Sequence, residues 1–185
     1  MEAVRSDSDD IQLRLEYETL IYHHNESSIS DANSIRESIK TLIATRGLPL
    51  NANIRLPFPS EFHSEIQPNS PTLQCSLRGQ IWKILLRIGH TKLHSYAQLV
   101  SLGASKDSEK IRIDALRTFR ADTDFISRVS EASLNRVLNA FCHSRGNQSG
   151  CYVQSMSLLC APFLYQMTEP DAFLAFEKFV SCYAP

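Results

Sequence analysis

The 185-residue chain is predicted to be all-α, and three features of its sequence carry that prediction. First, apolar residues recur with helical spacing in several segments, so that they fall on one face of a helix. Second, serine, aspartate or glycine stands where most of these segments are expected to begin or end. Third, no useful length of chain alternates apolar and polar residues as a half-buried strand does. The expected architecture is an irregular helical bundle.

Composition limits the classes of protein to which the chain can belong. With 43% hydrophobic residues and a net charge of −1, it can form a core but lacks the basic surface typical of nucleic-acid-binding proteins. No apolar run is long enough for a transmembrane segment, and the acidic N-terminus is unlike a secretory signal. The five cysteines and six histidines show no metal-ligand spacing. We therefore expect reduced thiols, no metal site and a cytoplasmic protein.

The N-terminal part is expected to contain a tail and a first helix. Residues 1–33 are rich in serine and acidic residues, which favours a mobile tail with at most one short helix. Helical spacing becomes clear at Ser34, which forms a capping-box pair with Glu37. Gly47 is expected to end this helix. The folded domain is accordingly predicted to cover residues 34–185.

The rest of the chain is predicted to be a proline-rich loop followed by helices. Residues 51–76 hold four prolines, which exclude a helix there. Two helices are then expected over about 77–88 and 92–102, each followed by glycine. Further helices are expected over about residues 107–117, 130–143, 152–166 and 171–183. The segment 152–166 is apolar on most sides, which predicts a central position, and Pro162 is expected to kink it.

Two short polar motifs interrupt this apolar pattern. The first ends in Arg117, with Asp114 three residues earlier on the same expected helix; the second is Tyr152-Val153-Gln154. Arginine can neutralise charge on a transferring phosphoryl group, and glutamine can orient the attacking water. Each motif also has a simpler interpretation. The first could be only a surface salt bridge, and the second only a packed tyrosine near a solvated glutamine.

With a third motif, this order of residues resembles the TBC (Rab-GAP) domain, a helical GTPase-activating domain. Arg78 and Trp82 are similar to its opening Arg-x-x-x-Trp helix, where a tryptophan in the core is expected. Residues 111–117 resemble its Ile-x-x-Asp-x-x-Arg arginine-finger motif, and residues 152–154 resemble its Tyr-x-Gln glutamine-finger motif. The two fingers lie 37 positions apart along the sequence.

The resemblance implies that the chain supplies catalytic residues in trans and has no nucleotide site of its own. Arg117 and Gln154 would be the two catalytic fingers. Asp114 would hold the guanidinium, Tyr152 would pack or hydrogen-bond beside the glutamine, and Thr118 would end the helix so that the arginine projects. The partner would be a small Ras- or Rab-like GTPase. GTP and Mg²⁺ would belong to that GTPase and would not be cofactors of this chain.

A finer resemblance is to the fungal mitotic-exit and septation checkpoint subunit of this family. It is carried by residues 36–49, 117–122 and 125–131, and it implies a scaffold-like co-subunit and a place at the spindle pole body. The chain departs from the family at Ser155, where glycine usually follows the finger glutamine. The resemblance also covers only the N-terminal half of the domain, which predicts a C-terminal truncation.

Two alternatives remain open at this level. A truncated, non-catalytic module could bind a GTPase or a scaffold partner without stimulating hydrolysis, and both the truncation and the serine after the finger glutamine favour it. A generic helical bundle whose motifs arose by chance would bind no GTPase.

Overall fold

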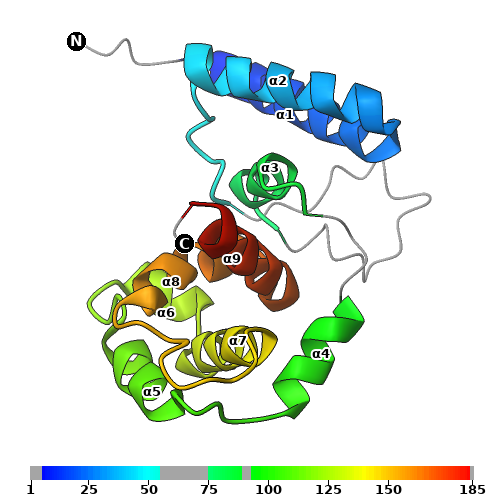
Figure 1. The fold of residues 1–185 in the computed structure, drawn as a ribbon. Coiled ribbons are helices and arrows are strands. Elements are labelled where there is room, and N and C mark those ends of the chain that lie inside the picture. The colour runs from blue at the N-terminus through cyan, green and yellow to red at the C-terminus, as the bar shows by residue number, and fades with distance from the viewer. Residues whose placement is uncertain (1–5, 55–74, 89–92, 184–185) are drawn as a thin grey trace. The chain divides into compact units, whose positions relative to one another are not determined.

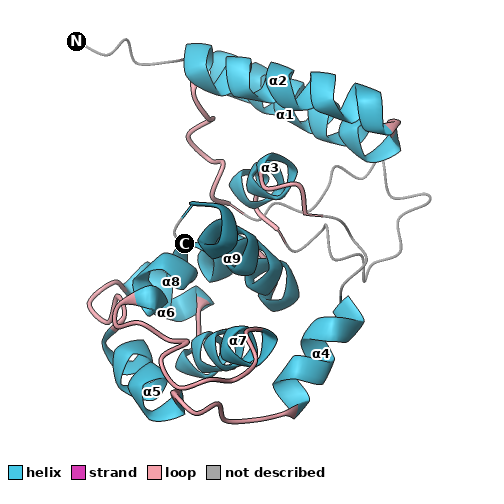
Figure 2. Ribbon diagram, viewed as in Figure 1, coloured by secondary structure: helices cyan, strands magenta, loops and turns pink. Residues whose placement is uncertain are grey.

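The computed structural model describes residues 6–54, 75–88 and 93–183. These residues form helices, turns and loops and include no strand (Figure 2), so the all-α prediction is confirmed. The chain divides into two compact units, residues 1–87 and residues 88–185. Most of the predicted proline-rich loop at 51–76 lies outside the described residues.

The described part of the first unit contains the helices α1 (Asp7–Glu26), α2 (Ile29–Arg46) and α3 (Leu77–Leu85) (Figure 1). Helices α1 and α2 pack along one another, and α3 contacts both. Their shared core is apolar and contains the fully buried side chains of Leu13, Tyr17, Ile39, Leu77 and Ile81.

Helix α1 differs from the short helix expected in the N-terminal tail, because it runs for 20 residues. Leu13, Tyr17 and Ile21 follow one another at intervals of four and are buried against the other two helices. Burial of each such side chain stabilises the fold by about 1.5–3 kcal/mol. The pattern is obscured in the sequence because Ile11 and Leu15 are also apolar but lie exposed.

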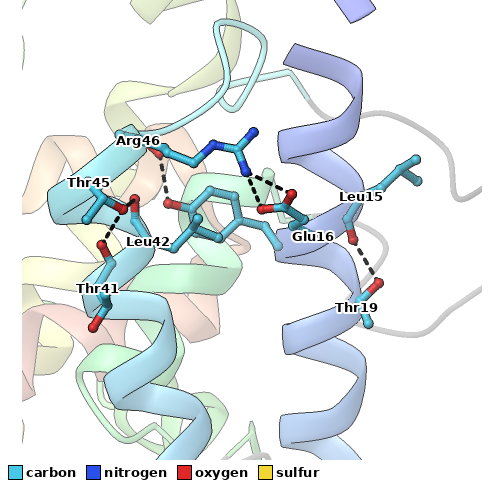
Figure 3. A network of polar contacts seen from close by, with 9 residues as sticks. Leu15, Glu16, Thr19, Thr41, Leu42, Thr45 and Arg46 are labelled. Atoms are coloured by element: carbon cyan, nitrogen blue, oxygen red, sulfur yellow. Dashed lines mark hydrogen bonds and ion pairs between the residues drawn. The ribbon is translucent and has the colours of Figure 1, made fainter. Parts of the chain in front are cut away.

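Polar contacts also connect α1 to the C-terminal end of α2. Arg46 donates to both carboxylate oxygens of Glu16 at 2.6 and 2.8 Å (Figure 3). The Tyr17 hydroxyl donates to the carbonyl of Gly47 at 2.8 Å. Gly47 has φ +68° and its N–H reaches the carbonyl of Ile43, which confirms that glycine ends this helix.

The start of α2 corrects the capping-box prediction. The helix begins at Ile29, after Ser28, so Ser34 is an interior residue and does not cap it. Inside the helix, the Ser34 carbonyl accepts a bond from the Ser38 hydroxyl at 3.2 Å. Serine and glutamate at capping spacing therefore occur here within a helix that had already started.

The second unit contains α4 (Leu93–Ser101), α5 (Ser108–Arg117), α6 (Thr123–Arg128), α7 (Glu131–Ser144), α8 (Met156–Gln166) and α9 (Glu169–Tyr183). Helix α7 contacts α4, α5, α8 and α9 and so occupies the centre of this unit. Its expected start is confirmed, because the Ser130 hydroxyl accepts from the N–H of Ser133 at 3.0 Å. Within the described residues, no helix has the length and apolar character needed to cross a bilayer.

One helix prediction in this unit needs correction, and one helix was not predicted. The helix expected at 152–166 begins at Met156, so Tyr152 and Gln154 lie in the loop that precedes it. Helix α6 was not predicted, because six residues are too few for an apolar period to show. Pro162 lies within α8, and the expected kink there stays a prediction.

Candidate functional site

The candidate site is formed where the loop of residues 150–155 lies against α5. The centre of the contact is the carboxylate of Asp114, whose side chain is only 5% exposed. One of its oxygens accepts the Tyr152 hydroxyl at 2.8 Å and the N–H of Ser155 at 2.9 Å. The other oxygen accepts a hydrogen bond from the guanidinium of Arg117. A single buried carboxylate therefore connects both polar motifs.

Arg117 combines an anchored guanidinium with access to solvent. It is the last residue of α5 and leaves 58% of its side chain exposed, although it is paired with Asp114 three residues earlier. The chain turns sharply after it, since Thr118 is extended and Phe119 has φ +47°. The end of the helix thus presents the arginine outward with one of its donors already fixed.

Thr118 joins the end of α5 to the start of α8. Its hydroxyl lies 2.7 Å from the carbonyl of Asp114 and 2.8 Å from the hydroxyl of Ser157. The N–H of Ser157 also reaches the Tyr152 hydroxyl at 3.3 Å. All three polar side chains are buried, and buried polar groups are stable only when they are hydrogen-bonded. These contacts fix the distance between the two motifs.

The electrostatics of the site keep Asp114 ionised. Burial by itself raises the pKa of this carboxyl, but hydrogen bonds from Ser155, Tyr152 and Arg117 outweigh it, and the pKa is lowered from its ordinary value. Burial raises the pKa of Tyr152 to about 12, so its hydroxyl stays protonated and can donate to Asp114.

Gln154 is the second-last residue of the loop. Its side chain is exposed and forms no hydrogen bond with the described residues, while Ser155, the next residue, is held by Asp114. The structure thus places the side chains of Arg117 and Gln154 on the exposed part of one site and fastens both segments to one carboxylate. It brings together Asp114, Arg117, Thr118, Tyr152 and Gln154.

Ser155 explains why glycine would be favoured after the glutamine. Its backbone has φ +74° and ψ +2°, in the left-handed region that costs most non-glycine residues about 1–2 kcal/mol. The serine therefore keeps the loop geometry at a cost in stability.

We expect Ser155→Gly to stabilise the chain by about 0.5–1 kcal/mol, because relief of the left-handed strain exceeds the entropy that glycine adds to the unfolded state. Urea unfolding would measure the change. Ser149→Gly is the matched control: that exposed serine does not have a positive φ, so glycine there should be neutral or destabilising. Equal effects at both positions would contradict the role of backbone strain.

Asp107 is a site residue that the sequence suggested only as part of a helix start. Its side chain makes no capping bond to α5. Instead, one oxygen accepts the N–H groups of Gly150 and Tyr152 at 2.8 and 3.1 Å. The other oxygen accepts Lys110 at 3.0 Å. Hydrogen bonds from Tyr152 and Lys110 lower the pKa of Asp107. No local sequence signal indicates the contact of this carboxylate with residues 150 and 152.

The third predicted motif lies in the first unit. Arg78 and Trp82 are both on α3, and Arg78 donates to the side-chain oxygen of Asn53 at 2.6 Å. Trp82 is partly buried, so the expectation of a tryptophan in the core is met only in part.

Comparison with known proteins identifies the class. Residues 75–184 match the Rab-GTPase-TBC domain, and this match covers more than half of the chain. The chain belongs to the Rab-GTPase-TBC domain family, which confirms the resemblance found in the sequence. No solved structure matches the chain.

Three of the relatives are named as mitotic check point or cell division control proteins. A putative mitotic check point protein BUB2 of Dictyostelium discoideum is 35% identical over 173 residues, which cover 94% of this chain and 44% of that protein. Cell division control protein 16 of Schizosaccharomyces pombe is 37% identical over 111 residues, or 60% of this chain and 36% of that protein. The mitotic check point protein BUB2 of Saccharomyces cerevisiae is 32% identical over 120 residues, a match that covers 57% of this chain and 39% of that protein. The chain spans less than half the length of each of these relatives.

Proposed function

We propose that this chain is the part of a GTPase-activating protein that supplies an arginine and a glutamine in trans to a small Ras- or Rab-like GTPase. One observation carries the proposal. The exposed side chains of Arg117 and Gln154 come from segments that are anchored to the same buried carboxylate, that of Asp114. Membership of the Rab-GTPase-TBC domain family supports it.

The proposed chemistry needs only positioning and charge. Water attacks the γ-phosphorus of GTP, and the bond to the bridging β–γ oxygen breaks, giving GDP and phosphate. Arg117 would neutralise charge on the transferring group, and Gln154 would orient the water. An arginine finger supplies about 10³–10⁵ in rate, which corresponds to roughly 4–7 kcal/mol of barrier. GTP and Mg²⁺ would enter with the GTPase.

Preorganisation is the contribution of the fold. Asp114 holds the loop before α8 against α5, and Thr118 bonds to Ser157 in the first turn of α8, before any partner binds. Less entropy is then lost when the two side chains reach their working positions. Exposed apolar side chains also flank the fingers: Ile113 lies one helical turn before Arg117, and Val153 precedes Gln154. Such residues suit the core of an interface with a protein partner.

The relatives suggest the process. Two are named as mitotic check point proteins and one as a cell division control protein. These names support a role in cell division, and we propose, from the finer resemblance in the sequence, that the activity regulates mitotic exit or septation in the cytoplasm and at the spindle pole body. A scaffold-like co-subunit of the GAP is part of this proposal, as the finer resemblance in the sequence implies.

Single-turnover hydrolysis of GTP by purified Ras- and Rab-like GTPases, with and without the chain, tests the proposal. We expect the chain to stimulate at least one GTPase, and we expect Gln154→Ala to reduce that stimulation by about 10²-fold, the loss typical of one preorganised donor at a transition state. Gln148→Ala is the matched control, since this glutamine is also exposed in the preceding loop. Equal rates for both variants would contradict the role of Gln154.

A non-catalytic binding module is the second candidate, and Ser155 is the observation that favours it. Its left-handed backbone, occupied by a residue with a Cβ and a hydroxyl, stands beside Gln154, where a GTPase would approach closely. This candidate predicts binding of a GTPase with no change in its hydrolysis rate, and Ser155→Gly would then be expected to create stimulation.

A further inference from the structure

Asp107 is the residue just before α5, and Asp114 lies seven positions later, on that helix. Both carboxylates accept hydrogen bonds from the same loop. Asp107 takes the N–H groups of Gly150 and Tyr152, and Asp114 takes the N–H of Ser155 and the hydroxyl of Tyr152. Hydrogen bonds to these two carboxylates thus hold the backbone of the loop at residues 150 and 152 and again at residue 155, and residue 154 lies between these points.

The Asp107 carboxylate is buried, and both of its oxygens accept hydrogen bonds. The Asp107 side chain is 1% exposed, and its second oxygen is occupied by Lys110 at 3.0 Å. The two N–H groups whose hydrogen bonds it accepts belong to the backbone, so these bonds fix the path of the loop directly. Gly150 itself has φ +90° and meets no atom near its Cβ position, so packing around that position does not hold it in place.

We propose that Asp107 is a positioning residue for the finger glutamine. This inference rests on the proposed function, and it assigns Asp107 a role through the loop backbone, without contact to the GTPase. Asp114 accepts the N–H of Ser155 beyond the glutamine and the side-chain hydroxyl of Tyr152 before it, whereas the backbone N–H groups at the start of the loop bond to Asp107. Loss of Asp107 therefore frees the backbone before Gln154 and disorders this residue, while Arg117 keeps its bond to Asp114.

The test is a double-mutant cycle in single-turnover GTP hydrolysis, with the maximal rate and the half-saturating concentration measured separately. Asp107→Ala should lower the maximal stimulated rate by 10-fold to about 10²-fold, the range set by loss of one transition-state donor, with little change in half-saturation. In a Gln154→Ala background the same change should cost less than about 3-fold, because the group that it positions is already gone. Asp107→Asn should restore most of the rate, since its amide oxygen can still accept both N–H bonds.

Controls separate this role from a general loss of stability. Ser130→Ala removes the cap of α7 and should leave the stimulated rate unchanged. Asp107→Glu keeps the charge but displaces the carboxylate by one methylene, so it should also lower the stimulated rate. It replaces Asp107→Ala as the test variant if that protein does not fold. Wild-type rates in both Asp107→Ala and Asp107→Glu, or equal losses from Asp107→Ala with and without Gln154, would overturn this inference and leave the proposed function standing. No stimulation by the wild-type chain would overturn the proposed function and this inference with it.

Discussion

Replacement of Arg117 by alanine is expected to slow stimulated GTP hydrolysis by about 10³-fold or more, because arginine fingers contribute about 10³–10⁵ in rate. The Arg117 guanidinium lies at the end of α5, and 58% of its side chain is exposed. Affinity for the GTPase in its GTP state should change much less, since a transition-state interaction lowers the maximal rate more than binding. Single-turnover rates at saturating chain concentration would measure the effect.

Arg112 provides the matched control for this prediction. It lies on the same helix, is exposed and pairs with Glu109, whereas Arg117 pairs with Asp114. Arg112→Ala should therefore leave the stimulated rate within about 2-fold, because exposed pairs contribute little. If Arg112→Ala and Arg117→Ala lost rate equally, general positive charge would explain the stimulation and a finger would not.

Replacement of Asp114 by alanine is expected to destabilise the second unit by about 2–4 kcal/mol. Tyr152 and Ser155 would lose their acceptor, and a buried donor left unpaired costs about 1–3 kcal/mol. Stimulation should also fall, because Arg117 and the loop lose their shared anchor. Urea unfolding of both proteins at neutral pH would measure the stability change, and Asp124→Ala on the exposed start of α6 should stay within about 0.5 kcal/mol.

The same comparison has a defined pH dependence. The folded state lowers the pKa of Asp114, so the stability that this carboxylate contributes is fully present above its unfolded pKa of about 3.9 and is lost as pH falls through the folded value. The difference between wild type and Asp114→Ala should be constant from pH 5 to 7 and shrink below about pH 4. A difference that grew in acid would contradict the assignment of an ionised, hydrogen-bonded carboxylate.

The sequence predicts helices best where periodicity and capping agree. Helix α7 has both, with Ser130 at its start and apolar residues on a single face, and its beginning is confirmed. In α1, buried and exposed apolar residues alternate between faces, so its length was underestimated. Helix α8 starts later than its apolar run because Ser155 takes a left-handed conformation, which interrupts a helix without any change in composition.

The candidate site shows the same division between local and long-range information. The pairing of Asp114 with Arg117 follows from their spacing on one helix and is seen in the structure. The hydrogen bonds that Asp114 accepts from the loop join residues about 40 positions apart in the sequence, so they depend on tertiary packing. Asp107 illustrates this limit: the sequence indicated only the start of a helix there, but its carboxylate accepts hydrogen bonds from two backbone N–H groups more than 40 positions away in the sequence.

The central claim is that Arg117 and Gln154 enter one nucleotide site together, and affinity for a transition-state mimic tests it most directly. The measurement is binding of the chain to a small GTPase loaded with GDP, Mg²⁺ and aluminium fluoride, compared with GDP and Mg²⁺ alone. We expect binding to the mimic to be at least about 10²-fold tighter, and we expect Arg117→Ala and Gln154→Ala each to remove most of that preference. Equal affinity for the two states, or a preference that survives both substitutions, would contradict the account.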